Sequence, residues 1–64
     1  MKDNRIREAL RDRRRHRAAM ARIREANGGT AYGLYGTQED AYIRSGNGLY
    51  WATQHARTLV SAAR

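Results

Sequence analysis

The stretch TQEDAYIRSGNGLYWA, residues 37–52, decides the fold, because it is compatible with two different structures. Its dipeptide Asn47-Gly48 is a strong signal for a β-hairpin. A three-residue loop, Gly46-Asn47-Gly48, places Ile43 opposite Trp51 and gathers the apolar residues on one side of the pair of strands. We therefore predict a hairpin here. Its outer face would display Tyr42, Arg44 and Tyr50.

The same stretch also carries the signals of a helix. Thr37 can cap a helix whose first turn holds Glu39 and Asp40, and Gly46 could end that helix before a second one begins at Leu49. The spacing resembles the opening of helix-turn-helix repressors, and the resemblance implies an all-α second half. Tyr42 and Asn47 depart from the repressor pattern, so this interpretation is kept as the alternative.

The rest of the second half completes an α+β prediction. Thr53 can cap a helix that runs to Ala63 with an apolar stripe. The Gly- and Tyr-rich residues before position 37 are typical of short strands and tight turns. We therefore expect one domain, with an arginine-rich helix over residues 1–27 and a ββ(β)α unit over residues 30–64. Its predicted core is Leu34, Ile43, Leu49, Trp51, Leu59 and Val60, with Tyr32 and Tyr35 packed beside it.

The first 27 residues predict a long helix. They hold no Gly or Pro and are rich in good helix formers. Asp3 or Asn4 can cap its start, and Asn27-Gly28 supplies a stop. Four apolar side chains share a broken face that could dock on the core or meet a second copy of the chain, as a homodimer through the first helix: Ile6, Leu10, Met20 and Ile23.

Positive charge is concentrated in that helix. Residues 1–27 carry ten Lys and Arg against four acids, whereas residues 28–64 carry three against two, within a total of +7. This asymmetry indicates an anionic partner, with nucleic acid first. One face is almost purely cationic and would contact phosphates: Arg7, Arg11, Arg14, Arg15 and Arg22. Arg13 and Arg17 would reach bases or a second strand. Tyr42 and Tyr50 could stack on unpaired bases, and Arg44 between them is also expected to contact the nucleic acid.

The run Arg13-Arg14-Arg15-His16-Arg17-Ala18 resembles the arginine-rich RNA-binding helices of lambdoid phage antitermination N proteins, in which a short helix enters an RNA hairpin. The resemblance is an analogy for how such a helix could bind, without a family assignment. A lone arginine-rich helix suits a distorted RNA groove. We therefore expect a small RNA-binding protein, with DNA second. A protein-interaction module that docks on an acidic partner surface is the alternative function.

Other functions find little support in the sequence. The chain has no cysteine, and neither His16 nor His55 has carboxylates at ligand or triad spacing. We expect no enzyme activity, no metal and no cofactor. No apolar run approaches a membrane span and the N-terminus lacks the apolar stretch of a signal peptide, so we expect a cytoplasmic protein without a membrane segment.

Overall fold

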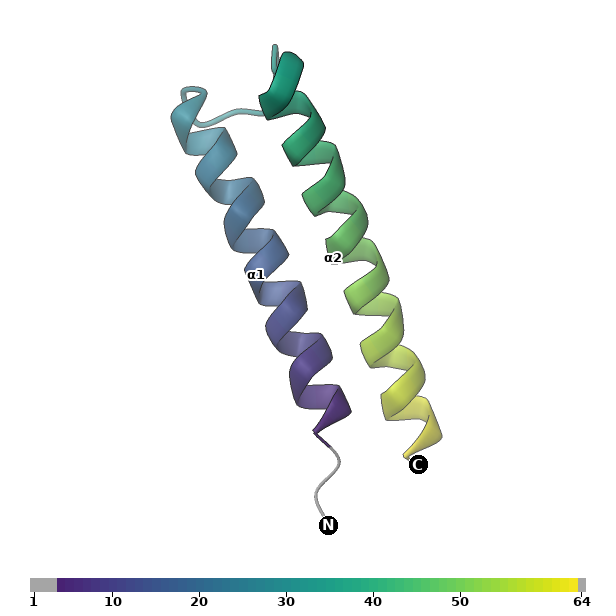
Figure 1. Cartoon of the computed structure of the whole chain (residues 1–64). Coiled ribbons are helices and arrows are strands. Elements are labelled where there is room, and N and C mark those ends of the chain that lie inside the picture. The colour runs from purple at the N-terminus through teal and green to yellow at the C-terminus, as the bar shows by residue number, and fades with distance from the viewer. Residues whose placement is uncertain (1–3, 64) are drawn as a thin grey trace.

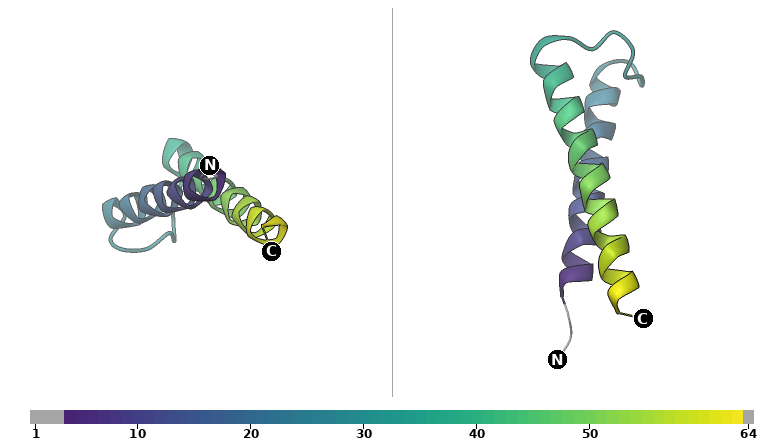
Figure 2. Two further views of the ribbon diagram at one scale, coloured as in Figure 1. Left: turned by 90° about the horizontal axis from the view of Figure 1, so that it is seen from below. Right: turned by 90° about the vertical axis from the view of Figure 1, so that its right-hand side faces the viewer.

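Two antiparallel α-helices make up the fold (Figure 1). The computed structural model describes residues 4–63 of the chain. α1 (Arg5–Ala26) has 22 residues and α2 (Gly36–Ala62) has 27. A loop over residues 27–35 joins them, so the first and last described residues lie at the opposite end of the hairpin from the loop. The resulting rod measures 45 × 15 × 14 Å, and Figure 2 shows that the two helix axes cross along it.

The predicted β structure is wrong. Residues 4–63 contain no strand, and the whole stretch 37–52 lies inside α2. The all-α alternative describes the fold class, but its second element does not break at Gly46 as a helix-turn-helix would require. Thr53 also does not cap a new helix, because its hydroxyl donates a 2.8 Å hydrogen bond to the carbonyl of Leu49 within α2.

α1 matches the helix that the sequence predicts. Asp3 lies outside the described residues. Asn4 precedes the helix, and its carbonyl accepts a hydrogen bond from the Glu8 amide at 2.9 Å, although its side chain makes no capping bond. At the other end Gly28 adopts φ +75°, a left-handed conformation that ends helices readily. The Gly29 amide donates to the Arg24 carbonyl at 2.7 Å, which closes the last turn.

A regular seam joins the helices. On each helix, partly or fully buried residues follow one another three and four positions apart, as in antiparallel coiled coils. Only two described residues are buried hydrophobics, Ala9 at 4% and Ala56 at 6% exposure. The seam is therefore narrow, and its fully buried positions are alanines, while the larger side chains along it are only half-buried. Its members are Ile6, Ala9, Arg13, His16, Met20 and Ile23 on α1, and Tyr42, Ser45, Leu49, Ala52, Ala56 and Leu59 on α2.

Two glycines inside α2 face α1 across this seam. A methyl group built on Gly48 would lie 2.5 Å from Cε1 and Nε2 of His16, so the absence of a side chain makes room for that ring. A methyl group on Gly46 would lie 3.7 Å from Cε of Met20, which is ordinary contact. Of the two glycines that indicate a turn in the sequence, Gly48 therefore makes room for a side chain of α1, whereas position 46 would also accept alanine.

The large apolar residues do not form the predicted core. Trp51 is 68% exposed, Ile43 55% and Val60 39%, whereas Leu34, Leu49 and Leu59 are half-buried. Trp51 instead packs its ring edge-on against Tyr50, with centroids 5.2 Å apart. The predicted packing of the early tyrosines is also wrong, because both are exposed in or next to the loop. They are Tyr32 at 90% and Tyr35 at 81%.

Candidate nucleic-acid interface

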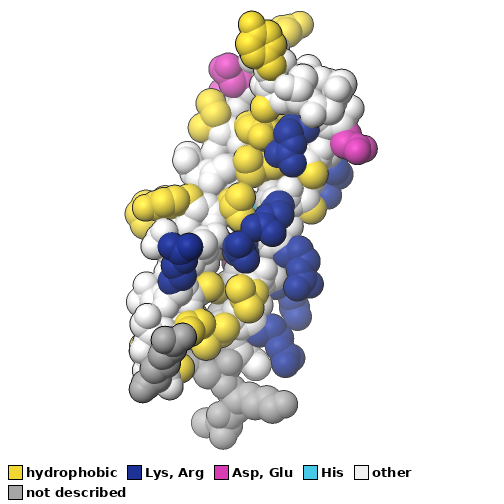
Figure 3. Space-filling view, turned by 180° about the vertical axis from the view of Figure 1, so that it is seen from behind, with side chains coloured by type: hydrophobic (Ala, Val, Ile, Leu, Met, Phe, Trp, Pro, Cys, Tyr) yellow, Lys and Arg dark blue, Asp and Glu magenta, His cyan; other side chains and the backbone are white. Residues whose placement is uncertain are grey.

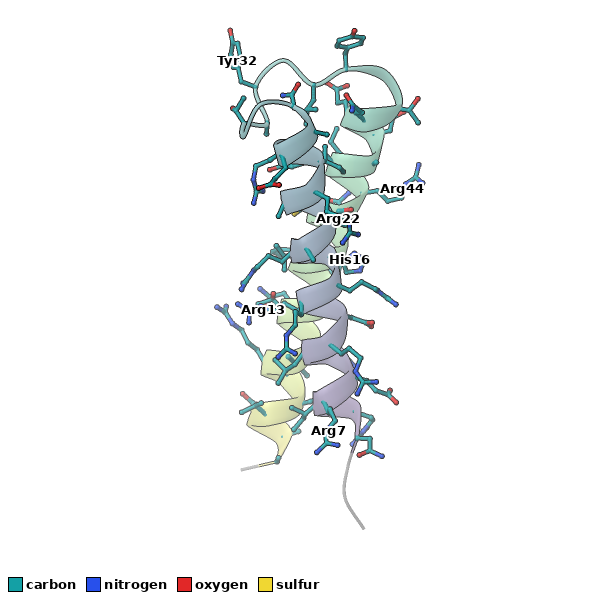
Figure 4. All side chains as sticks on the ribbon, turned by 90° about the vertical axis from the view of Figure 1, so that its left-hand side faces the viewer. Arg7, Arg13, His16, Arg22, Tyr32 and Arg44 are labelled. Carbon is teal, nitrogen blue, oxygen red and sulfur yellow. The ribbon has the colours of Figure 1, made fainter. Side chains whose placement is uncertain are left out.

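Four arginines form a row on the outer side of α1. Spacings of four, three and eight residues place Arg7, Arg11, Arg14 and Arg22 within one arc, opposite the seam, around the small Ala18. All four side chains are exposed. The row spans about 22 Å at 1.5 Å per residue. Figure 3 shows basic side chains in a column along the α1 edge of the molecule, and Figure 4 labels Arg7 and Arg22. We call these four residues the arginine row.

The arginine row carries uncompensated charge. Within residues 4–63, none of its four guanidinium groups forms an ion pair. Arg15 differs, because its Nη2 donates to Oδ1 of Asp12 at 2.9 Å, and both side chains are largely exposed. Exposed pairs of this kind contribute little to stability, but they do occupy the donor. Arg15 stands seven residues from Arg22 and lies on the same face, but its pairing with Asp12 distinguishes it from the four arginines of the row.

Two predicted arginines take other positions. Arg13 lies in the seam, half-buried, and its Nε is buried without a hydrogen-bond partner among the described residues. It therefore does not extend from the outer face of α1. Arg17 is exposed, on the side of α1 that carries Leu10. The arrangement leaves Arg17 accessible to an anion, whereas Arg13 points its charge into the space between the helices.

The predicted outer face with Tyr42, Arg44 and Tyr50 is not formed, because alternate residues share a face on a strand but not on a helix. Tyr42 is half-buried, and its hydroxyl accepts a 3.0 Å hydrogen bond from Nη1 of Arg24. Arg44 is exposed on α2, and Figure 4 shows it on the same side of the hairpin as His16. Tyr50 is 56% exposed and contacts Trp51.

Two hollows lie beside the helices, toward the end of the hairpin opposite the loop. One, of about 580 Å³, has Ile6 and Leu10 between arginines of the row. The other, of about 390 Å³, lies between the helices and is lined by Arg13 and Arg57 together with Leu10, Ala56 and Val60. Sequence reasoning missed Arg57. Its spacing of seven residues from Tyr50 and fourteen from Ile43 is the signal that could have placed it on a common side of α2.

The described part of the chain has neither a cluster of metal ligands nor a membrane-spanning helix. No group of three or more His, Asp or Glu residues there could hold a metal ion. Neither α1 nor α2 has a stretch both long and apolar enough to cross a bilayer. His16 packs in the seam against Gly48, and His55 is an exposed residue of α2.

Comparison of the chain with protein-family models, with curated proteins and with solved structures gives no match.

Proposed function

We propose that the protein binds nucleic acid through the arginine row of α1, with RNA favoured over DNA. The observation that carries the proposal is the row itself, four exposed guanidinium groups without ion-pair partners in residues 4–63. Arginine suits this role because its planar fork pairs with phosphate oxygens and is only weakly hydrated. Each phosphate that the row neutralises would release condensed counterions, which favours binding at low salt.

The dimensions of α1 fit this role. A row about 22 Å long matches the axial length of roughly six base pairs of B-form duplex at 3.4 Å per pair. α2 covers the opposite side of α1, so a nucleic acid would meet a single charged helix face. The described residues contain no helix-turn-helix that would read duplex DNA, and a lone arginine-rich helix suits an irregular RNA groove.

The test is binding to a labelled structured RNA and to a duplex DNA of equal length across a salt series. For the double variant Arg11→Gln/Arg14→Gln, we measure the slope of the logarithm of the binding constant against the logarithm of the salt concentration. The magnitude of this slope should fall by roughly 1.4 to 1.8, which corresponds to two phosphates. A matched control, Arg44→Gln/Arg57→Gln, removes the same charge from two exposed positions of α2, away from the row, and should change the slope much less.

Equal salt dependence of binding in the two double variants would show that net charge alone drives binding. This result would refute the proposal that the arginine row is the binding surface. Binding weaker than micromolar for both nucleic acids in low salt would refute the function and favour the protein-interaction alternative. Circular dichroism of every variant verifies that the helices are retained.

A further inference from the structure

The hairpin exposes more surface than a compact protein of its size. A monomeric protein of 7.3 kDa exposes roughly 4,200 Å², whereas this chain exposes 5309 Å². Its radius of gyration is 14.2 Å, against about 11 Å for a compact domain of this length. The excess of about 1,100 Å² is comparable with the roughly 800 Å² that each partner buries in a stable interface. The rod is therefore suited to binding another element along its side.

One side of the rod offers a groove for such an element. The hollow of about 390 Å³ between the helices has Ala56 at its floor, and Leu10 and Val60 are 43% and 39% exposed beside it. Ile43, Tyr50 and Arg57 stand seven residues apart, so they form a column on this same side of α2. The column and Val60 together extend over about 25 Å. Figure 3 shows hydrophobic side chains along the middle of this face, with basic ones between them.

The charges of the groove specify its occupant. Arg13 and Arg57 line it, and no acidic residue does. Arg13 is half-buried, and its Nε is buried without a hydrogen-bond partner among the described residues. Partial burial of a charged group is costly until an opposite charge reaches it. A second copy of this chain would place further arginines against these two. A nucleic acid would supply anions but nothing apolar to cover Leu10 and Val60.

We propose that this groove binds an acidic amphipathic helix of a partner protein and that the two chains together form a three-helix bundle. The apolar stripe of the partner helix packs on Leu10, Ala56 and Val60. Carboxylates on the flanks of that stripe pair with Arg13 and Arg57. A helix of about 18 residues would cover both the hollow and the exposed column beside it, from Ile43 to Val60. None of the four residues of the arginine row lines this groove, so substitutions can test the two surfaces separately.

The test uses a synthetic helical peptide of about 21 residues, three heptads with Leu at both core positions and Glu on the flanks. One control peptide replaces Glu with Lys, and another replaces Leu with Ser. In an amide chemical-shift titration without nucleic acid, the Glu/Leu peptide should bind at least about tenfold more tightly than either control. The shifted amides should cluster at Leu10, Thr53, Ala56 and Val60.

Matched variants locate the binding. Val60→Asp should weaken the Glu/Leu peptide about tenfold, whereas Ala62→Asp adds the same charge to an exposed position nearby and should change it by less than about threefold. Arg57→Gln, which keeps the apolar floor, should also weaken binding. Circular dichroism of each free variant confirms that the hairpin is folded.

Several results would overturn the proposal. Equal affinity for the Lys peptide would remove the charge argument, and equal affinity for the Ser peptide would show simple attraction to the arginine row. Sedimentation of the free protein as a dimer, with the same amides shifting on dilution, would assign the groove to a second copy. The same amides shifting with the structured RNA would assign it to nucleic acid.

Discussion

α1 and α2 form one hairpin from opposite compositions. α1 holds nine arginines, three acids and no glycine, whereas α2 holds two arginines, two acids and three glycines. α1 is thus helical on local propensity and opposed by its own charge. α2 contains two interior glycines that disfavour a helix by about 1 kcal/mol each. The contrast indicates that α2 depends on contact with α1 more than on its own sequence.

The seam is where the dependence of α2 on α1 can be broken outright. Ala56→Lys would place a cation at a buried site beside Arg13 and Arg57, and should destabilise the hairpin by about 3 kcal/mol. Urea unfolding followed by circular dichroism measures this change. Ala62→Lys is the matched control at an exposed position of α2 and should change stability by less than about 0.5 kcal/mol. Equal effects would show that the helices do not need their contact.

A substitution at Gly48 tests whether contact with α1 outweighs the low helix propensity of glycine in α2. Gly48→Ala improves propensity by about 1 kcal/mol, but its methyl group would lie 2.5 Å from the His16 ring. Overpacking of this kind costs about 1 to 3 kcal/mol. We expect a net loss of about 1 kcal/mol in the free energy of unfolding. In a His16→Ala background the same substitution should instead stabilise, and a loss in both backgrounds would contradict the assignment to His16.

Gly46 provides the opposite case to Gly48, because it has room for a side chain. A methyl group there meets only Cε of Met20, at 3.7 Å. Gly46→Ala should therefore stabilise the hairpin by about 0.5 to 1 kcal/mol through helix propensity. The measurement is the midpoint of thermal unfolding, with Gly48→Ala melted under the same conditions. If both substitutions shift the midpoint in the same direction, contact with α1 does not distinguish the two glycines.

The smallest expected effect concerns the bond between Arg24 of α1 and Tyr42 of α2. Tyr42→Phe removes an acceptor for the Arg24 guanidinium in a half-buried position. We expect a loss of about 0.5 to 1 kcal/mol in the free energy of unfolding. Tyr50→Phe is the control, because Tyr50 is exposed on the same helix, and it should leave stability almost unchanged. A larger loss for Tyr50→Phe would contradict the different roles of these tyrosines.

The first helix could be predicted because its signals are local. Residues 4–26 favour a helix at nearly every position, and Gly28 ends it in the left-handed conformation that the sequence indicates. The arginine row follows from the same periodicity, so the five arginines predicted on one face of α1 do share it, and only the ion pair with Asp12 distinguishes Arg15 from the other four. Arg13 departs from its predicted position because the seam repeats every three and four residues and passes through it.

The second helix could not be predicted in the same way, because its decisive interactions are distant in sequence. Gly46-Asn47-Gly48 has turn propensity in isolation, and only the position of the His16 ring shows why glycine occurs at position 48 within a helix. Large apolar residues were expected in a core. The seam instead buries only Ala9 and Ala56 completely, and Trp51 and Ile43 lie outside it.

The placement of both described ends opposite the loop has a mechanical consequence (Figure 1). Force applied to the two ends of an antiparallel hairpin loads the seam one turn at a time, beginning with Ile6 and Leu59, rather than across all of its turns at once. The hairpin should therefore unzip at low force, while the loop residues 27–35 remain unloaded until the last turns separate. A pulling force between the two ends would therefore separate α1 from α2 without unfolding either helix.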